Sequence, residues 1–242
     1  QPSYEGDMRG AASVAHVYGQ NLVAAESLTA ALQPWAFAPR DLKPMIDMEF
    51  ALGVNRPVIH TSVHQPLTDK APGFSLFIFG QYFNRLETWG EQAKPWVDYM
   101  ARSSYMLQQG RNVADVAYFY GEEAPLTALF AKAVPGDLPT ANAFDFVNPD
   151  VLLNQLSNDG PDLVAKSGAR YKALYLGGSS GRMSLSVLRR IDTLVRGGAT
   201  LIGEKPTGSP ALQDDAAAFA RLAEALWSGD AGKGRVLASR DA

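Results

Sequence analysis

A short apolar segment that ends in one acid, Leu22–Glu26, is the feature that most constrains the fold of this chain. An apolar run of this length is typical of a parallel strand buried on both faces. Two hydroxyl side chains, Ser27 and Thr29, follow the acid. An α/β barrel carries its catalytic residues at the carboxyl ends of such strands. Glu26 is therefore a candidate catalytic residue, and the alternative is an acid that caps the next helix or faces solvent.

The composition excludes several classes of protein. The chain has 242 residues, of which 46% are hydrophobic and 19% are charged, enough for one or two globular domains. A net charge of −3 disfavours nucleic acid and anionic membranes as partners. The absence of cysteine excludes disulfides and thiolate chemistry and fits any compartment. Because the chain begins with Gln1 and shows no signal-peptide pattern, we expect residues to precede it in the intact protein.

The first half of the chain alternates predicted helices and strands. The hydrophobic pattern predicts helices over residues 7–19, 41–52 and 89–109, strands over 22–26 and 54–60, and a long loop over 61–87. Loops this long within a compact domain are usually functional. These βα units are too few to close an eight-stranded barrel.

The second half has the pattern of a doubly wound parallel sheet. Strands are expected at residues 113–120, 144–147, 163–165, 173–176, 200–202 and 235–238, with helices starting at 148 and covering 184–196 and 215–227. We place the boundary near Asn112, which gives domains of residues 1–111 and 112–242.

Polar side chains near the two predicted strands of the first half are candidate substrate ligands. His60 ends one strand, and His64 and Gln65 follow it in the long loop. In a continuing strand the two histidines would lie too far apart to share a metal ion. A histidine or glutamine at this position can bind a sugar hydroxyl, and a satisfied structural histidine is the alternative for His64.

Glu87 and Trp89 stand just before the helix over 89–109. They could present a carboxylate and an aromatic ring to a sugar, because aromatic faces stack on the apolar faces of pyranoses. The alternative for Glu87 is an acid favoured by the helix dipole. In the second half, Glu122 and Glu123 could join an acid pair or bind a cation, or simply lie in a solvated loop. The Gly177–Gly181 run lacks the Walker lysine and the dinucleotide spacing, which favours a tight turn over a phosphate site.

Several ordered segments resemble glycoside hydrolase family 106, the α-L-rhamnosidases. The matching segments are His16–Gly19, Ala25–Thr29, Gly53–Arg56, His60–Pro66 and Trp96–Tyr118. The resemblance covers residues 8–123 well and the second half more loosely. The second half also resembles the cysteine-free, glutamine-amidotransferase-like domain that follows the barrel in family 42 β-galactosidases.

The resemblance implies the last part of a (β/α)8 (TIM) barrel followed by a doubly wound, flavodoxin-like domain. It implies inverting removal of terminal α-L-rhamnose and a dependence on calcium whose ligands cannot be assigned here. Glu26 matches the family segment and would be one of the two catalytic carboxylates, as the general base. The partner acid would precede Gln1, with Glu87 as the alternative within the chain. His60, His64, Gln65 and Trp89 would bind the sugar.

Two other functions stay open: a retaining β-galactosidase-like barrel enzyme, and a non-catalytic carbohydrate-binding fragment. The expected ligand is a rhamnose-containing oligosaccharide or glycoside, and the expected partner is the missing N-terminal part of the same polypeptide. No nucleic acid or membrane is expected as a partner. The isolated piece is expected to be inactive, and the intact protein to be a periplasmic or secreted bacterial protein.

Overall fold

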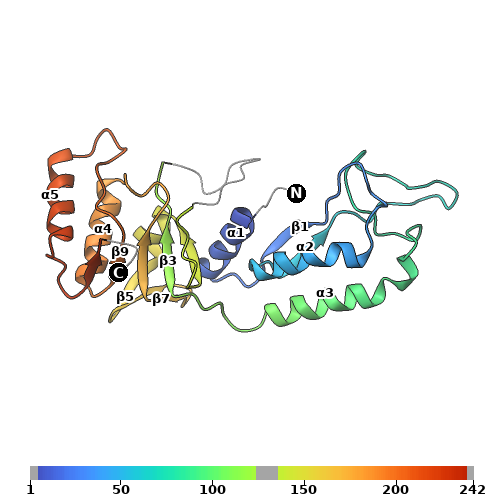
Figure 1. The fold of residues 1–242 in the computed structure, drawn as a ribbon, viewed down its shortest axis with the longest axis horizontal. Helices are drawn as coiled ribbons and strands as arrows, with labels where there is room; N and C mark the ends of the chain where they lie inside the picture. Colours follow the sequence, from blue (N-terminus) through green and yellow to red (C-terminus); the bar gives the residue numbers. More distant parts are fainter. Residues whose placement is uncertain (1–4, 124–135, 239–242) are drawn as a thin grey trace. The chain divides into compact units, whose positions relative to one another are not determined.

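The chain forms two compact units (Figure 1). The computed structural model describes residues 5–123 and 136–238. Unit 1 comprises Gln1–Asn21 and Arg111–Ala242, and unit 2 comprises Leu22–Gly110. The first helix, α1 (Glu5–Tyr18), therefore belongs with the second half of the chain. The predicted first domain, residues 1–111, therefore differs from unit 2 mainly in residues 1–21, which belong to unit 1.

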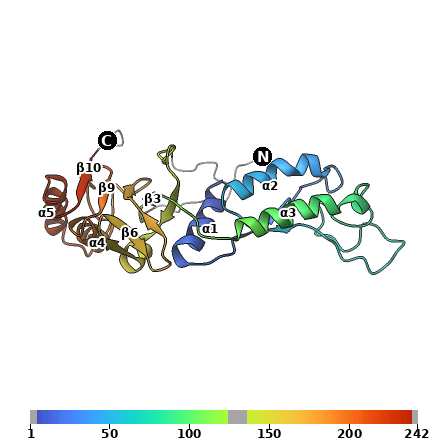
Figure 2. The same ribbon diagram turned by 90° about the horizontal axis from the view of Figure 1, so that it is seen from below.

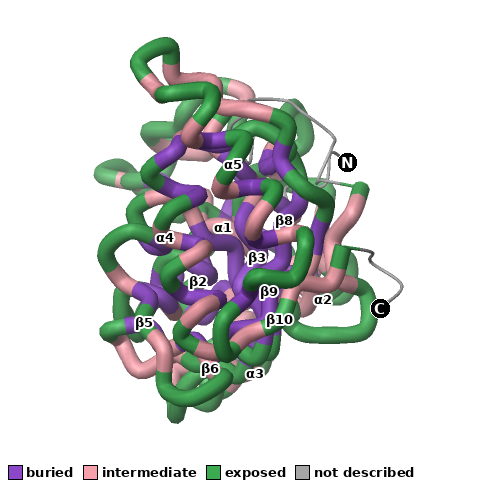
Figure 3. The backbone as a smooth tube through the Cα atoms, turned by 90° about the vertical axis from the view of Figure 1, so that its left-hand side faces the viewer, coloured by how far each residue is buried: buried purple, intermediate pink, exposed green. Residues whose placement is uncertain are grey.

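Five parallel strands form the sheet of unit 1, in the order β10–β9–β8–β3–β4. Their bounds are Val116–Phe119 (β3), Phe144–Val147 (β4), Ala173–Leu176 (β8), Thr200–Ile202 (β9) and Arg235–Leu237 (β10). The strands β3 and β8 are buried along their whole length, as Figure 3 shows. The predicted parallel α/β arrangement is confirmed for this unit.

Two helices cover one face of this sheet. The helices α4 (Leu185–Arg196) and α5 (Ala216–Trp227) pack on each other and share one core cluster with β3, β8 and β9. Ser184 and Asp215 cap their first turns, and the Asp215 carboxylate accepts two backbone N–H groups. Capping of this kind satisfies donors that a helix start leaves unpaired.

The opposite face of the sheet carries an aromatic cluster. Tyr118, Phe146 and Tyr175 are buried there, and the Tyr118 ring stacks on Tyr175 and meets Phe146 edge to face. Leu138, from the connection between β3 and β4, packs against the cluster. This connection therefore contributes to the cover of that face.

The helix predicted to start at residue 148 is present but short, and an antiparallel hairpin sheet follows it. The chain makes one π-helical turn at Val151–Gln155 (η2) and then enters β5 (Leu156–Asp159), β6 (Asp162–Ala165) and β7 (Arg170–Tyr171). Leu152 and Leu156 are buried as expected, but Leu156 pairs with Ala165 in the hairpin instead of continuing a helix. The predicted strand at 163–165 lies within β6.

Unit 2 contains a pair of parallel strands, β1 (Ala24–Ser27) and β2 (Arg56–Ile59), with the helices α2 (Pro39–Ala51) and α3 (Lys94–Leu107). The two helices lie side by side, as Figures 1 and 2 agree, and a short 3-10 helix, η1 (Gly90–Gln92), precedes α3. The prediction that the first strand is fully buried is wrong: only Ser27 of β1 is buried, because β1 has one neighbouring strand.

Candidate functional site at the carboxyl ends of β1 and β2

Glu26 lies at the carboxyl end of β1 and is exposed. Its Oε1 accepts a hydrogen bond of 2.5 Å from the Thr29 hydroxyl, three residues further along the turn. The next residue but one, Leu28, has a left-handed backbone with φ of 63°. Such a conformation in a bulky residue is strained and tends to occur at functional positions.

A second acid, Glu49 on α2, is buried beside the same strand end. It is 2% exposed, and its Oε2 lies 2.6 Å from the hydroxyl oxygen of Ser27. Burial raises the pKa of the Glu49 carboxyl, and the hydrogen bond with Ser27 opposes that rise. The sequence analysis missed this residue, although Leu42, Ile46 and Glu49 share the buried stripe of α2.

The end of β2 is held against a later segment of the loop. The His60 N–H donates to the Ser27 carbonyl over 3.0 Å, which continues the pairing of β1 and β2. His60 and Thr61 exchange backbone hydrogen bonds with Gln81, at 2.9 and 2.8 Å. A Cβ at Gly80 would lie 3.2 Å from His60 Nδ1, so the imidazole lies against the glycine backbone.

Gln81 links this strand end to Glu87. Its side chain is fully buried, and its Nε2 donates to Glu87 Oε1 over 3.0 Å. Glu87 is itself 7% exposed, and burial raises its pKa against the opposing effect of hydrogen bonds from Thr88 and Gln81. A carboxyl group with a raised pKa retains its proton more readily, as a general acid must.

Unpartnered polar atoms concentrate near this point. Among the described residues, four buried side-chain atoms have no hydrogen-bond partner, and three of them belong to the loop region: His60 Nδ1, Gln81 Oε1 and Asn84 Nδ2. Buried polar groups are normally paired, so a group of unpaired ones is a place where water or a ligand can bind. Gln81 is thus a candidate ligand that the sequence analysis missed.

Two predicted ligands, His64 and Gln65, are engaged in the loop itself. The His64 ring stacks on Phe74, with centroids 6.0 Å apart, and the Gln65 amide donates to the Pro72 carbonyl over 2.7 Å. A Cβ at Gly73 would lie 2.5 Å from the His64 carbonyl oxygen, so this close pairing requires glycine. Phe74 and Phe77 are 73% and 86% exposed on the same loop.

Trp89 packs within unit 2. Its indole N–H donates to the Phe37 carbonyl over 3.2 Å, and its ring meets Phe83 edge to face at 5.0 Å. The side chain is half-buried and packs against the core cluster that contains Ile46 and Trp96. These contacts occupy part of the ring, and a role in sugar binding stays a prediction.

A metal site is not formed by side chains of the described residues alone. Within residues 5–123 and 136–238, no group of three or more His, Cys, Asp or Glu side chains could hold a metal ion.

In unit 1, the glycine run at the end of β8 is a packed turn. The Asp137 carboxylate accepts hydrogen bonds from the Gly178 N–H, at 3.0 Å, and from the Tyr118 hydroxyl, at 2.6 Å. A Cβ at Gly177 would lie 2.3 Å from the Tyr118 ring. An internal carboxylate therefore binds the backbone N–H that a phosphate site would offer, and Glu122 similarly accepts from Ser184 at the start of α4.

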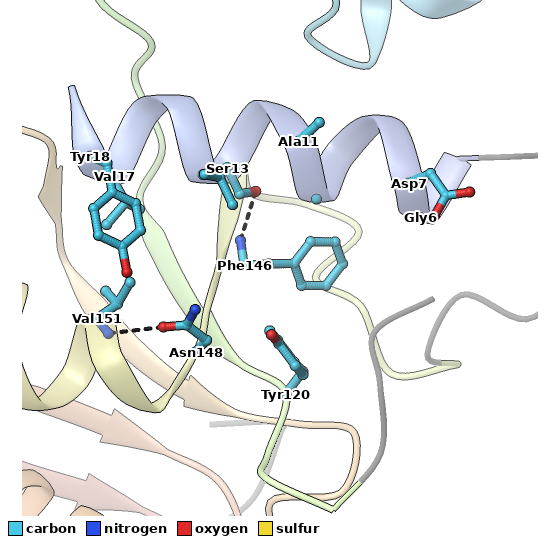
Figure 4. A pocket seen from close by; sticks show the side chains of 12 residues that line it. Gly6, Asp7, Ala11, Ser13, Val17, Tyr18, Tyr120, Phe146, Asn148 and Val151 are labelled. Atoms are coloured by element: carbon cyan, nitrogen blue, oxygen red, sulfur yellow. Dashed lines mark hydrogen bonds between the residues drawn. The ribbon is translucent and has the colours of Figure 1, made fainter. Parts of the chain in front are cut away.

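A pocket of about 370 Å³ lies between α1 and the carboxyl ends of β3 and β4 (Figure 4). Tyr18, Tyr120, Phe146 and Asn148 contribute to its lining. The Phe146 N–H donates to Ser13 and the Val151 N–H donates to Asn148, both over 2.9 Å, and these bonds fix its wall.

In the part of the chain that the structure describes, no helix is long and apolar enough to span a bilayer.

Unit 2 combines parallel strands, the acid Glu26 at a strand end, and two buried acids, Glu49 and Glu87. This combination makes it a candidate glycoside hydrolase site. Comparison with known families agrees with this class. The chain belongs to the glycoside hydrolase family 106, described as alpha-L-rhamnosidase, whose profile matches residues 1–242. This confirms the family resemblance found in the sequence.

Two similar proteins are much longer than this chain. A solved structure titled as a rhamnosidase from Novosphingobium sp. PP1Y is 59% identical, with a TM-score of 0.91 over 98% of this chain and 23% of that one. A protein of Formosa agariphila named "Putative beta-glucuronidase" is 39% identical over 227 residues, which are 93% of this chain and 19% of the relative. The chain thus spans about a fifth of the length of these relatives.

Proposed function

We propose that the chain is part of an α-L-rhamnosidase that removes terminal rhamnose from plant-type glycans or glycosides. The observation that carries this proposal is the 59% identity to the Novosphingobium rhamnosidase over nearly the whole chain. The chain spans 23% of that relative, so the remaining part of the enzyme would complete the active site. Activity of residues 1–242 alone is not expected.

The fold supports a finer assignment for each unit. In unit 2, the parallel pair β1 and β2, each followed along the chain by a helix, would be the last βα units of a (β/α)8 barrel. In unit 1, the five strands numbered along the chain have the spatial order 2-1-3-4-5, which is the flavodoxin-like order. The packed glycine turn and the absence of cysteine favour a non-catalytic, glutamine-amidotransferase-like domain.

The mechanism would use two carboxyl groups. In inverting hydrolysis these lie about 6.5–9.5 Å apart, with a water molecule between one of them and the sugar. Glu26, exposed at the end of β1, would take a proton from this water as its oxygen forms the new bond to the anomeric carbon. The acid partner would give its proton to the glycosidic oxygen as the old bond breaks. That partner would lie outside this chain, or would be Glu87, whose burial already favours the protonated form.

The sugar ligands would come from the same end of the strands. His60 and Gln81 have buried polar atoms without partners, and these would bind sugar hydroxyls or ordered water. His64, Gln65 and Trp89 would contribute after adjustment of their present contacts. Calcium, implied by the family resemblance, would need ligands from the rest of the enzyme, and chelation followed by calcium addition tests that dependence. A periplasmic or secreted location belongs to the same proposal.

Hydrolysis of an aryl α-L-rhamnoside by the full-length enzyme tests the assignment of Glu26. We expect Glu26→Gln to lower kcat by at least about 100-fold, because general acid–base catalysis contributes that much. Glu91→Gln, a change of an exposed acid in η1, is the matched control. NMR of the first-formed sugar should show inverted anomeric configuration. Full activity of the Glu26→Gln enzyme would remove Glu26 from the mechanism.

The name of the Formosa relative supports a second candidate, a β-glucuronidase. A retaining enzyme of that kind would use Glu26 as a nucleophile, with the carboxyl groups about 5–5.5 Å apart. Turnover of an aryl β-glucuronide, or of an aryl β-galactoside, with retained configuration would favour this reading. Binding of rhamnosides without any turnover would favour the third possibility, a carbohydrate-binding protein.

A further inference from the structure

Ser27 connects Glu26 to a buried acid on α2. Glu49 and Ser27 are 2% and 1% exposed, and the Glu49 Oε2 and Ser27 Oγ atoms lie 2.6 Å apart. Ser27 directly follows Glu26, and its carbonyl accepts the N–H of His60 at the end of β2. Ser27 is therefore held through both its side chain and its backbone at the point where the two strands present their polar residues.

A count of protons shows which group donates. The Ser27 hydroxyl has one proton, and its oxygen lies near two acceptors: the Ala25 carbonyl at 3.1 Å and Glu49 at 2.6 Å. An ionised carboxylate can only accept, so both contacts would then compete for one proton. If Glu49 is protonated, it donates to Ser27, and Ser27 donates to Ala25. Each contact then has its own proton.

The surroundings of Glu49 also favour the uncharged form. Besides Glu49, the charged groups on β1, β2, α2 and α3 are Glu26 on β1, Arg56 on β2, Arg40, Asp41, Lys43 and Asp47 on α2, and Lys94, Asp98 and Arg102 on α3. Among the described residues, none of these forms an ion pair or hydrogen bond with Glu49; Lys43 pairs with Asp47, and Lys94 with Asp98. A buried carboxylate without a cation is unfavourable, and burial accordingly raises the pKa of Glu49.

The contact between Glu49 and Ser27 stabilises a strained turn. Leu28 follows Ser27 with its φ at 63°, a conformation that costs on the order of 1–3 kcal/mol in a residue of this kind. Such a turn persists only where neighbouring contacts fix it. Burial of the Leu28 side chain provides one such contact, and the hydrogen bonds of Ser27 provide the others.

We propose that Glu49 is an uncharged carboxylic acid that donates a hydrogen bond to Ser27 and thereby fixes the end of β1 that presents Glu26. Glu49 is in this view a positioning residue, since it touches Ser27 and not the substrate. The role in catalysis rests on the proposed function, whereas the protonation state of Glu49 does not.

Infrared spectroscopy of the full-length protein at neutral pH tests the protonation state directly. The difference spectrum between the wild-type protein and Glu49→Gln should show the carbonyl band of a protonated carboxyl group. Asp98→Asn is the matched control, because the pairing with Lys94 lowers the pKa of Asp98; its removal should delete a carboxylate band and leave the band region of protonated carboxyl groups unchanged. Loss of a carboxylate band in Glu49→Gln would overturn the proposal.

Kinetics on an aryl α-L-rhamnoside test the positioning role. Glu49→Gln keeps an uncharged donor and should keep kcat within about threefold, whereas Glu49→Leu and Ser27→Ala should lower kcat by about 10- to 100-fold, with a smaller change in KM. Rescue by glutamine distinguishes hydrogen bonding from simple filling of space. Wild-type kcat in both Glu49→Leu and Ser27→Ala would overturn the role. A wild-type enzyme inactive on rhamnosides would refute the proposed function and, with it, this role, whereas the infrared result would stand.

Discussion

His16 Nδ1 lies 2.7 Å from Oδ1 of Asp145, and this contact joins α1 to β4 within unit 1. The other oxygen of Asp145 accepts the Tyr171 hydroxyl over 3.0 Å, from β7. Asp145 is 3% exposed. Its two oxygens are paired with two side chains from distant parts of the sequence. A helix, a sheet strand and the hairpin are thereby held together by one acid.

Removal of this acid should destabilise unit 1. We expect Asp145→Ala to lower the free energy of unfolding by about 3 kcal/mol, because it leaves the hydroxyl of buried Tyr171 unpaired and breaks a buried pair. Urea unfolding measures the change. Asp159→Ala is the control, since Asp159 pairs with Arg170 at the surface, where such pairs contribute about 1 kcal/mol or less. Equal losses in the two variants would contradict the network.

The packed glycine turn makes a prediction with an internal control. Gly177→Ala would place a Cβ 2.3 Å from the Tyr118 ring and should cost about 2 kcal/mol or more, since the buried ring must move. Gly181→Ala, four residues later, places its Cβ in open space and should change stability little. Thermal unfolding of both variants measures the difference. Equal melting temperatures would show that the turn is looser than the structure indicates.

Two leucines with left-handed backbones should respond differently to glycine. Leu32 has φ of 66° and is 73% exposed, so Leu32→Gly relieves strain with little loss of burial and should leave stability equal or up to about 1 kcal/mol higher. Leu28 has a similar φ but is 8% exposed, and Leu28→Gly should cost about 2 kcal/mol through lost packing. Urea unfolding compares the two, and the same sign of change in both would contradict the argument.

Stability should depend on pH through Glu87. Burial raises the pKa of its carboxyl in the folded protein, so the folded state binds a proton more tightly than the unfolded chain. This contribution is complete below the ordinary pKa of glutamate, about 4.3, and is lost as pH rises through the raised value. Melting temperatures measured across this interval should therefore fall less with rising pH in Glu87→Gln than in the wild-type protein.

Asp98→Asn serves as the opposite case for the same measurement. The ion pair with Lys94 lowers the pKa of Asp98, so its contribution is present above the ordinary pKa of aspartate and is lost as pH falls. The Asp98→Asn variant should therefore lose less stability than the wild-type protein as the pH falls. A pH profile unchanged by Glu87→Gln would mean that Glu87 titrates normally in the folded protein.

Local patterns predicted the regular elements of unit 1 well. The strands at 144–147 and 173–176 were predicted with the bounds of β4 and β8, because apolar runs bounded by turn residues are strong signals. The β5–β6 hairpin was missed, although Gly160 and Pro161 form a two-residue turn with glycine first. Leu152, Leu153 and Leu156 also fit a helical stripe. Short apolar segments leave this ambiguity to the tertiary structure.

The sequence patterns did not predict which helices and strands pack on each other. The pattern of residues 7–19 predicted a helix but not that it packs on β4, because amphipathic spacing does not identify the partner. For the site, Glu26 at a strand end was predictable, whereas the burial of Glu49 depends on how α2 packs against β1.

The chain leaves unit 1 after α1, forms unit 2, and returns to unit 1 at Arg111. A gene cut at the apparent boundary near Asn112 would separate the open sheet from the helix that borders β4. The shortened product would expose Asp145 and the backbone of Phe146 to water, and would offer β4 as an unprotected edge for aggregation. To obtain unit 1 alone, one should instead delete residues 22–110 and join the two flanking segments with a short linker.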